Sequence, residues 1–266
     1  MEKIMFEKNT FRKRLLSMLS VDLKRMIKSR LFYIMLAVAL VVPVLIVVMT
    51  TLMDGSVTVN PETGVETVIE GFKNAWQSIG TTSDAPMSMD ITSMCNINLM
   101  FFAVLVFICL FISEDFRTGY SKNIFTVRAK KMDYVISKMV VGYIVGVLML
   151  ILYFIGSMLG GAIASLPFTL EGATPTSVVM CMLSKIFLML VFVAIFTTIA
   201  LAAKAKAWLS ICSSLGGGML LFMMIPSLTP LDSTMLNVIL CLAGGALFSV
   251  GLSYAGNVIL KRTSLI

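Results

Sequence analysis

Six long apolar runs occupy most of this chain and constrain its fold more than any other feature. A helix rises about 1.5 Å per residue, so roughly 20 apolar residues cross the ~30 Å hydrocarbon core of a bilayer. Only 13% of the 266 residues are charged and 58% are hydrophobic, whereas about a quarter of an ordinary soluble domain is charged. We therefore predict an all-α membrane protein with six transmembrane helices, at 31–53, 94–113, 139–166, 178–203, 208–228 and 235–260.

The basic residues predict how these helices are oriented. Of the 21 Lys and Arg residues, 19 fall on alternate connections or at the two ends of the chain, on one predicted side of the membrane. By the positive-inside rule both termini are cytoplasmic. Residues 1–30 then form a cytoplasmic basic segment, and residues 31–266 form the six-span domain, with an outer loop at 54–93 and a cytoplasmic loop at 114–138. Nucleic acid is not an expected partner, because the positive charge is split into short juxtamembrane patches.

Several classes of chemistry are excluded or disfavoured by what the sequence lacks. It has no histidine, which removes His-dependent triads, the common metalloprotease motif and most zinc sites. No predicted span centre holds an acid/base pair, so an intramembrane enzyme is disfavoured. No catalytic residue, metal site or cofactor site is predicted. The five cysteines are read as small packed hydrophobes, with a Cys95–Cys181 bridge at the outer face as the alternative.

Residues 11–30 predict a basic amphipathic helix before the first span. Helical spacing places apolar residues on one face: Leu16, Leu19, Leu23, Met26 and Ile27. Much of the other face is occupied by Arg14, Val21, Lys24, Arg25 and Lys28. This pattern is typical of a helix that lies in the lipid headgroup region. A solvated juxtamembrane helix is the alternative.

The outer loop contains a second helical pattern. We predict a helix over Val65–Ile79, with an apolar stripe that could gate the release of cargo or simply cap the bundle. A β-hairpin through Val57–Val59 and Val65–Val68 is the alternative. Six acids surround this region and would favour a cationic peptide over an anionic lipid head. The candidate gate residues are Val65, Val68, Ile69, Phe72, Trp76 and Ile79.

Lys185 is the one basic residue inside a predicted span, near its outer end. We predict that Lys185 lies at the outer interface, with its aliphatic stem in lipid and its ammonium in the interface. The alternative is a functional charge inside the membrane. Glycines spaced four apart, Gly142 and Gly146 and then Gly156 and Gly160, favour close packing of helices within or between chains.

The connection between the second and third spans is the candidate functional segment. Two acids lie where the second span ends, on the side of the membrane that otherwise carries the basic residues. Gly119 can break one helix and start another. Aromatic residues give the segment an apolar face. Such a segment can insert into a groove of a cytosolic partner; a positively charged tether lying on lipid is the alternative. The candidate residues are Glu114, Asp115, Phe116, Arg117, Gly119, Tyr120, Lys122 and Asn123.

These features together resemble the ABC-2 type permeases, the membrane subunits of ATP-binding-cassette exporters. The resemblance rests on the basic helix before six spans, Glu114 followed by Gly119, the Lys122-Asn123 pair, Lys138 at the start of the third span, and the basic tail with Tyr254, Gly256 and Lys261-Arg262. Two departures are Val127 where many members have proline, and an outer loop that is largest after the first span. The bacitracin and lantibiotic exporter or immunity branch is the most similar.

The resemblance implies a function for the whole chain. Loop 114–138 would form the coupling helix that contacts a cytosolic ATPase dimer, and a second permease chain, identical or paralogous, would complete the pathway in a bacterial cell membrane. The sequence lacks a G-x-x-x-x-G-K-[ST] motif, so ATP and Mg²⁺ would be bound by the partner. The expected activity is export of a hydrophobic or amphipathic compound such as an antimicrobial peptide. A stand-alone immunity protein that sequesters a peptide without a motor is the alternative.

Overall fold

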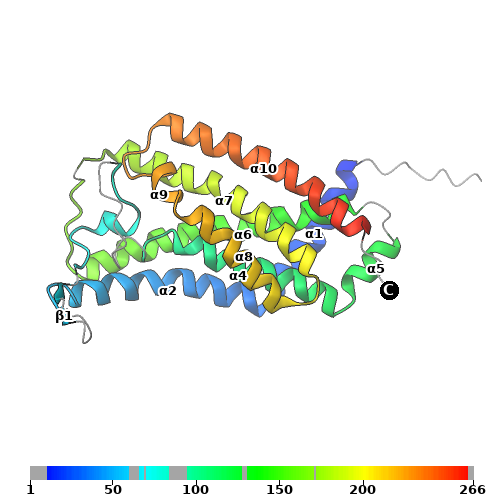
Figure 1. The fold of residues 1–266 in the computed structure, drawn as a ribbon, viewed down its shortest axis with the longest axis horizontal. Coiled ribbons are helices and arrows are strands. Elements are labelled where there is room, and N and C mark those ends of the chain that lie inside the picture. Colours follow the sequence, from blue (N-terminus) through cyan, green and yellow to red (C-terminus); the bar gives the residue numbers. More distant parts are fainter. Residues whose placement is uncertain are drawn as a thin grey trace, which may run out of the picture.

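The computed structural model describes residues 11–59, 66–68, 70–83, 95–127, 131–170 and 172–262. Long helices run side by side along the long axis of the molecule and form one bundle (Figure 1). An α-helix satisfies its own backbone N–H and C=O groups, which is the requirement for crossing hydrocarbon. The helices are α1 (Phe11–Lys28), α2 (Arg30–Leu52), α4 (Leu99–Arg117), α5 (Tyr120–Val127), α6 (Met132–Ile163), α7 (Pro175–Ala203), α8 (Ala207–Phe222), α9 (Ile225–Leu228) and α10 (Met235–Arg262).

Five of the described helices, α2, α4, α6, α7 and α10, are long and apolar enough to cross a membrane. The predicted span over residues 208–228 is instead divided into α8 and α9, which are separated at Met223 and Met224. The 16 residues of α8 extend only about 24 Å. Pro226 in the first turn of α9 starts a new helix more readily than it continues one. Among the described residues, five continuous helices of spanning length are therefore observed and not the six predicted.

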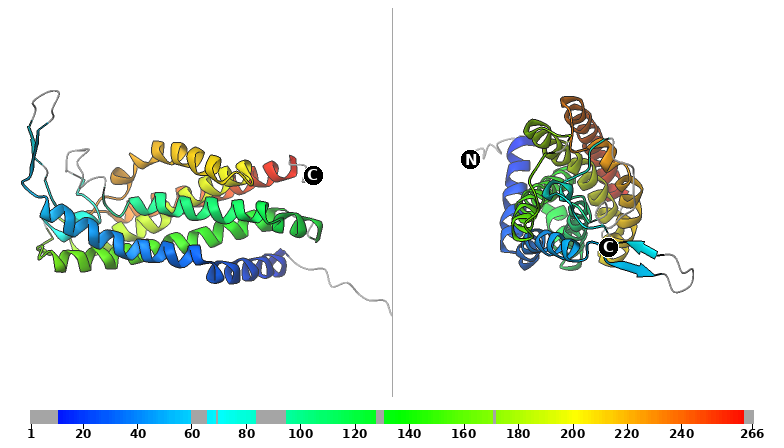
Figure 2. Two further views of the ribbon diagram at one scale, coloured as in Figure 1. Left: turned by 90° about the horizontal axis from the view of Figure 1, so that it is seen from below. Right: turned by 90° about the vertical axis from the view of Figure 1, so that its left-hand side faces the viewer.

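Helix α1 crosses the end of the bundle at an angle to α2, from which Ser29 separates it (Figures 1 and 2). It packs against α6 through a face that buries Met18, Asp22 and Met26. Leu16 and Ile27 of the predicted apolar face remain about half exposed. The helix thus presents one face to the bundle and a second, partly apolar face away from it.

Glycines bring two pairs of long helices into close contact. A Cβ atom built on Gly156 of α6 would stand 2.4 Å from the carbonyl oxygen of Leu40 in α2. A Cβ on Gly245 of α10 would stand 2.9 Å from the carbonyl oxygen of Phe187 in α7. Both distances are to backbone atoms, so any larger residue would push the helix axes apart. Small residues at such contacts replace the hydrophobic driving force that lipid does not supply.

The predicted helix over Val65–Ile79 is wrong, and the alternative hairpin forms. Strand β1 (Val57–Val59) pairs antiparallel with β2 (Glu66–Val68), with Val57 opposite Val68. β-Branched residues dominate both strands and favour extended backbone. The only helical turn in the described part of this segment is the 3₁₀ helix η1 (Ala75–Ser78). Gly71 passes so close to α2 that a Cβ would stand 2.4 Å from the carbonyl oxygen of Thr50.

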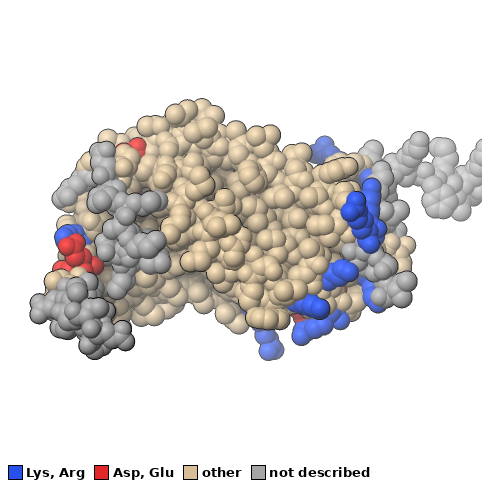
Figure 3. Space-filling view, viewed as in Figure 1, with Lys and Arg blue, Asp and Glu red and all other residues tan. Residues whose placement is uncertain are grey.

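Charged residues gather at the two ends of the bundle. Lys and Arg residues crowd the end that carries α1 and α5, and acidic residues lie at the other end (Figure 3). There Lys73 forms an ion pair with Glu70 at 3.2 Å. The visible face between the ends is uncharged. We call these the basic end and the hairpin end.

Candidate functional site

The chain turns sharply at the basic end between α4 and α5. Thr118 and Gly119 separate the two helices, and Gly119 has φ +74°, in the left-handed region that favours glycine. A Cβ on Gly119 would meet nothing within 4 Å. Glycine is therefore needed here for its backbone conformation and not for space, and the structure places the helix break where the sequence suggested it.

The eight candidate coupling residues differ in how far they are buried. Four of them are exposed: Glu114 and Arg117 on α4, whose charged groups are 4.0 Å apart, and Lys122 and Asn123 on α5. Phe116, Gly119 and Tyr120 are partly buried. Asp115 alone is fully buried, with 0% exposure. The segment therefore has an outward side that a partner could contact and an inward acid that contacts the bundle.

Asp115 is the centre of a buried ionic cluster. Its Oδ2 lies 2.7 Å from Nζ of Lys138 in α6 and accepts a hydrogen bond from the Tyr134 hydroxyl at 2.9 Å. Its Oδ1 lies 2.7 Å from a guanidinium nitrogen of Arg25 in α1. One carboxylate thus joins three helices at the basic end.

A second acid completes the cluster from α1. Asp22 Oδ1 lies 2.8 Å from Nζ of Lys138, and Oδ2 accepts a hydrogen bond from the Ser137 hydroxyl at 2.6 Å. The side chains of Asp22, Asp115 and Lys138 are all fully buried, and that of Arg25 is 31% exposed. We call Asp22, Arg25, Asp115 and Lys138 the ionic cluster.

The ionic cluster pairs two acids with two bases, so its formal charges cancel. Buried charges are tolerated when each is paired and its remaining donors and acceptors are satisfied, and removing one partner typically costs about 3–5 kcal/mol. Burial by itself lowers the pKa of the Arg25 guanidinium, but its hydrogen bond to Asp115 and the charge of Asp115 outweigh burial and raise that pKa. Arg25 therefore stays charged beside Asp115, and the ion pairs of the cluster hold α1, α4 and α6 in one arrangement.

Aromatic contacts extend this arrangement to α5. The guanidinium carbon of Arg25 stands 3.8 Å from the ring centroid of Tyr120, the first residue of α5. The ring of Phe125, also in α5, meets the ring of Tyr134 edge-on at 5.2 Å. Tyr134 in turn donates to Asp115. A displacement of α5 must therefore change contacts of the ionic cluster.

Two further contacts tie neighbouring segments to the same end. Arg14 of α1 forms an ion pair with Asp133 of α6 at 3.0 Å. Lys131, just before α6, donates to the carbonyl oxygen of Leu260 near the end of α10 at 2.7 Å. The basic end thus links α1, α4, α5, α6 and α10.

Sequence reasoning singled out Asp115 and Lys138 but missed Asp22 and gave Arg25 only a place on a polar helix face. One signal was available. Met18, Asp22 and Met26 are spaced four residues apart, which places them on one face of a helix. An acid in the middle of an apolar stripe suggests a buried partner of opposite charge.

The candidate gate residues do not share a face. Val65 and Ile69 lie outside the described residues, Val68 is exposed on β2, and Phe72 and Ile79 are buried against the bundle. Trp76 donates from Nε1 to the carbonyl oxygen of Phe168 at 3.1 Å, and its ring packs near Phe154 of α6. The buried members therefore attach this segment to the hairpin end.

The predicted position of Lys185 at the outer interface is wrong. Its side chain is fully buried, and Nζ donates to Oδ1 of Asn98 at 2.8 Å and to Oγ1 of Thr229 at 3.0 Å. Asn98 and Thr229 adjoin α4 and α9, so three elements meet at this ammonium. The suggested Cys95–Cys181 bridge is not formed, because both cysteines are free thiols.

The bundle of long apolar helices, with a charged turn at its basic end, defines a multi-pass membrane protein. Residues 19–223 match the profile of the ABC-2 family transporter proteins, and the chain belongs to that family. The match includes all four residues of the ionic cluster and ends at the break between α8 and α9. No curated protein and no solved structure matches the chain. Membership supports a membrane component of a transporter, a type of subunit that is normally not itself an enzyme.

Proposed function

We propose that the chain is the permease subunit of an ATP-driven exporter and forms half of its translocation pathway. The observation that carries the proposal is the ionic cluster, which joins α1, α4 and α6 directly behind the exposed surface of α5. In this proposal a cytosolic ATPase dimer binds ATP and Mg²⁺ and contacts α5 and the exposed residues Glu114, Arg117, Lys122 and Asn123. The chain itself holds no cofactor.

The ionic cluster would transmit motion because its energy depends strongly on the distances between its charged atoms. When the ATPase moves α5, the contacts of Tyr120 with Arg25 and of Phe125 with Tyr134 move with it. A buried ion pair cannot stretch gradually without a large penalty. The helices that share Asp115 must therefore shift together, from one packed arrangement to another. ATP binding would favour one arrangement only if the ATPase binds the two unequally.

The proposed orientation has both termini in the cytoplasm of a bacterial cell. Its support is the gathering of basic residues at the end that carries α1 and α5 (Figure 3). The broken pair α8 and α9 would make the sixth crossing, because it returns the chain to the hairpin end, where α10 begins. Half-exposed Leu16 and Ile27 would place the outward face of α1 in the lipid headgroup region.

A second permease chain would complete the pathway. Helices α8 and α10 support this part of the proposal, because Leu220 is 80% exposed, Leu247 is 74% exposed and Val250 is 72% exposed. Lipid or a second chain, identical or paralogous, can cover such apolar faces. At the hairpin end, Phe72, Trp76 and Ile79 would close the pathway until cargo leaves. The expected cargo is hydrophobic or amphipathic, with an antimicrobial peptide as one example.

Co-purification tests the coupling. A tagged chain extracted from its own cells in mild detergent should retain an ATPase. Asp115→Asn keeps the acceptor for Tyr134 but removes the charge shared by Arg25 and Lys138. It should keep the ATPase bound yet lower cargo-stimulated ATP hydrolysis roughly tenfold or more, because loss of one partner of a buried pair exceeds 1.4 kcal/mol. Glu114→Ala, on the exposed side, should instead weaken retention of the ATPase.

Lys24→Gln, at an exposed position one residue before Arg25, is the control and should change neither property. If no ATPase accompanies a folded, membrane-inserted chain, the exporter proposal fails and a stand-alone binding protein is favoured. Normal stimulated hydrolysis by Asp115→Asn would remove the ionic cluster from the coupling.

The orientation is tested by labelling single cysteines in a cysteine-free background. A cysteine at Asn74 should react with an impermeant maleimide added outside intact cells, and a cysteine at Lys122 should react only after the membrane is opened. Both positions lie outside the spanning helices. Labelling of position 122 from outside would invert the orientation and would contradict contact of α5 with a cytosolic ATPase.

A further inference from the structure

Lys185 places a positive charge among neutral partners near the hairpin end. Its side chain is fully buried, and both acceptors of its Nζ, Asn98 Oδ1 and Thr229 Oγ1, are neutral. Among the described residues, no Asp or Glu forms an ion pair with it. Lys138, by contrast, contacts two carboxylates at 2.8 and 2.7 Å. Neutral acceptors offset only part of the cost of taking an ammonium out of water. Burial of Lys185 therefore opposes the packed arrangement that the structure shows.

Thr229 belongs to a short stretch that closes over Lys185. We call residues 225–233, which comprise α9 and the chain that leads from it toward α10, the closing segment. Two backbone contacts connect it to the segment that follows η1: the Leu231 N–H donates to the carbonyl oxygen of Thr81 at 2.8 Å, and Asp232 Oδ1 accepts from the Ser83 N–H at 2.8 Å. These are bonds between single residues. The closing segment can therefore separate from its neighbours without unfolding any of the long helices.

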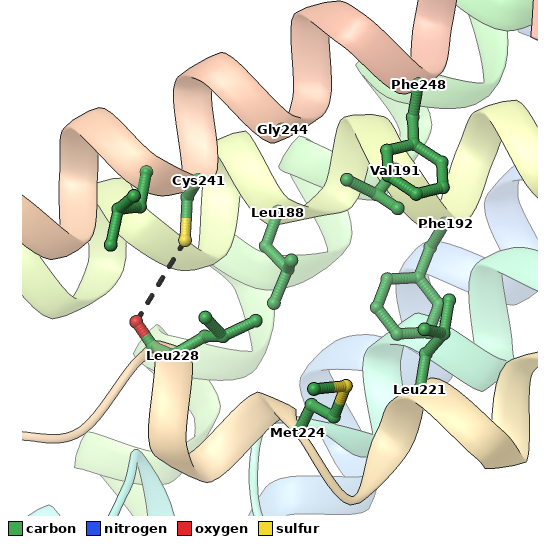
Figure 4. Close-up of a pocket in the computed structure, with 10 residues that line it drawn as sticks. Leu188, Val191, Phe192, Leu221, Met224, Leu228, Cys241, Gly244 and Phe248 are labelled. Carbon is green, nitrogen blue, oxygen red and sulfur yellow. Dashed lines mark hydrogen bonds between the residues drawn. The ribbon is translucent and has the colours of Figure 1, made fainter. Parts of the chain in front are cut away.

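Three cavities border the closing segment. An apolar cavity of about 220 Å³ lies between α7, the α8–α9 pair and α10, and Met224 and Leu228 face it (Figure 4). A second cavity, of about 240 Å³, is lined in part by Leu231, and a third, of about 370 Å³, in part by Asp232. Atoms beside empty space lose the dispersion contacts that packing would give them. The closing segment is therefore held less firmly than a fully packed helix.

The second cavity brings a polar space close to the acceptor of Lys185. Gly80 and Leu231 both line it, and a Cβ on Gly80 would stand 3.9 Å from the carbonyl oxygen of Thr229. A polar cavity of this size admits water. If the closing segment moves away, water reaches Lys185 and hydrates the ammonium. The other side chains of this cavity are mostly neutral and polar, with Asn74, Gln77, Thr81, Thr82 and Thr169 among them.

We propose that Lys185 is a built-in charge that favours opening of the closing segment. Burial of Ile225 and Leu231, which are 0% and 6% exposed, stabilises the closed arrangement, and dehydration of Lys185 destabilises it. The two effects oppose each other, so the closed and open arrangements stay close in free energy. A ligand or a helix movement that distinguishes them can then shift the balance. This inference goes beyond the coupling proposed at the basic end, because it concerns the opposite end and requires no ATPase.

Hydrogen–deuterium exchange of the purified full chain in neutral detergent measures the opening. Mass spectrometry follows the amides of residues 78–83 and 225–233, with residues 139–153 of α6 as an internal reference. Lys185→Met should slow exchange at Thr229 and Leu231 roughly tenfold or more, because an apolar residue of similar volume often stabilises a packed state relative to a buried charge. Lys185→Gln, which keeps a neutral donor, should also slow it. Lys185→Arg keeps the charge and should exchange no more slowly than wild type.

Asn98→Asp tests the same idea without removing Lys185. The substitution places a carboxylate where Asn98 Oδ1 now lies, 2.8 Å from Nζ, and supplies the missing counter-charge. Exchange of the closing segment should slow. Asn98→Asp combined with Lys185→Met leaves that carboxylate buried and unpaired, so exchange should become faster than in Lys185→Met alone. Lys73→Met removes an exposed lysine at the same end and should change nothing.

Faster exchange in Lys185→Met and Lys185→Gln would show that Lys185 holds the segment closed, and would overturn the proposal. Unchanged exchange would overturn it as well. Equal slowing in the α6 reference would show that Lys185 limits the stability of the whole bundle and not a local opening. If Lys185→Met does not fold, Lys185→Gln and Asn98→Asp decide the question. The measurement contains no ATPase, so its failure would leave the coupling proposal standing, and a missing ATPase would not affect its result.

Discussion

Lys138→Met is expected to destabilise the protein by about 3–5 kcal/mol, the cost of leaving buried charges without their partner. The substitution removes the ammonium that contacts both Asp22 and Asp115, and leaves Arg25, which lies 2.7 Å from Asp115 but 3.8 Å from Asp22. Methionine fills nearly the same volume, so loss of packing contributes little. Thermal unfolding of the purified chain in detergent, followed by circular dichroism, measures the effect.

The double variant Asp22→Asn with Lys138→Met separates charge from shape. It removes one acid together with one base and leaves the Arg25–Asp115 pair at 2.7 Å. Most of the lost stability should return, because the remaining buried charges again balance. Lys24→Met, at an exposed position on α1, should have no measurable effect. A single-variant loss below about 1 kcal/mol would be typical of an exposed ion pair and would contradict the burial described here.

Gly156→Ala should prevent close packing of α2 against α6. The added methyl group would stand 2.4 Å from the Leu40 carbonyl oxygen and 2.7 Å from Cγ of Pro43. Neither atom belongs to a flexible side chain, so the helices must separate. Overpacking of this kind costs about 1–3 kcal/mol, which exceeds the ~1 kcal/mol that alanine gains over glycine in a helix.

Gly244→Ala is the matched control on α10, because its Cβ would meet nothing within 4 Å. This variant should be neutral or slightly more stable than wild type. The comparison is made by thermal unfolding and by protease resistance of the purified chains. Equal behaviour of the two variants would mean that α2 and α6 are not in the contact that Gly156 indicates.

Much of the helical architecture follows from residue type and length. An apolar run of more than about 18 residues has few stable alternatives to a helix in lipid, so α2, α4, α6, α7 and α10 lie close to their predicted ranges. Gly119 was identified as a helix break because few other residues adopt its backbone conformation. The two acids near it are unusual on the side of the membrane that carries most basic residues, but the sequence does not show which of them, Glu114 or Asp115, is buried. The two are adjacent, and only the rotation of α4 against α6 decides which one is buried.

Other features depend on contacts between segments distant in the sequence. Periodicity in residues 65–79 fitted a helix, but the strand pairing of Val57 with Val68 and the close approach of Gly71 to α2 favoured a hairpin. Local pattern carries no information about such partners. The break between α8 and α9 was missed for a related reason. Met223 and Met224 are apolar, so mean hydropathy stays high across them and does not report the change in backbone conformation.

The sequence by itself determined the class of molecule, the positions of the long helices and the gathering of basic residues at one end. Those properties follow from hydrophobicity and net charge, which are sums over residues. The tertiary structure alone decided the ionic cluster and the place of Lys185. Asp22, Asp115 and Lys138 are far apart along the chain, and their energies depend on distances of about 3 Å and on exclusion of water. Lys185 could reach an interface from its own helix, and only the positions of Asn98 and Thr229 place it inside the bundle.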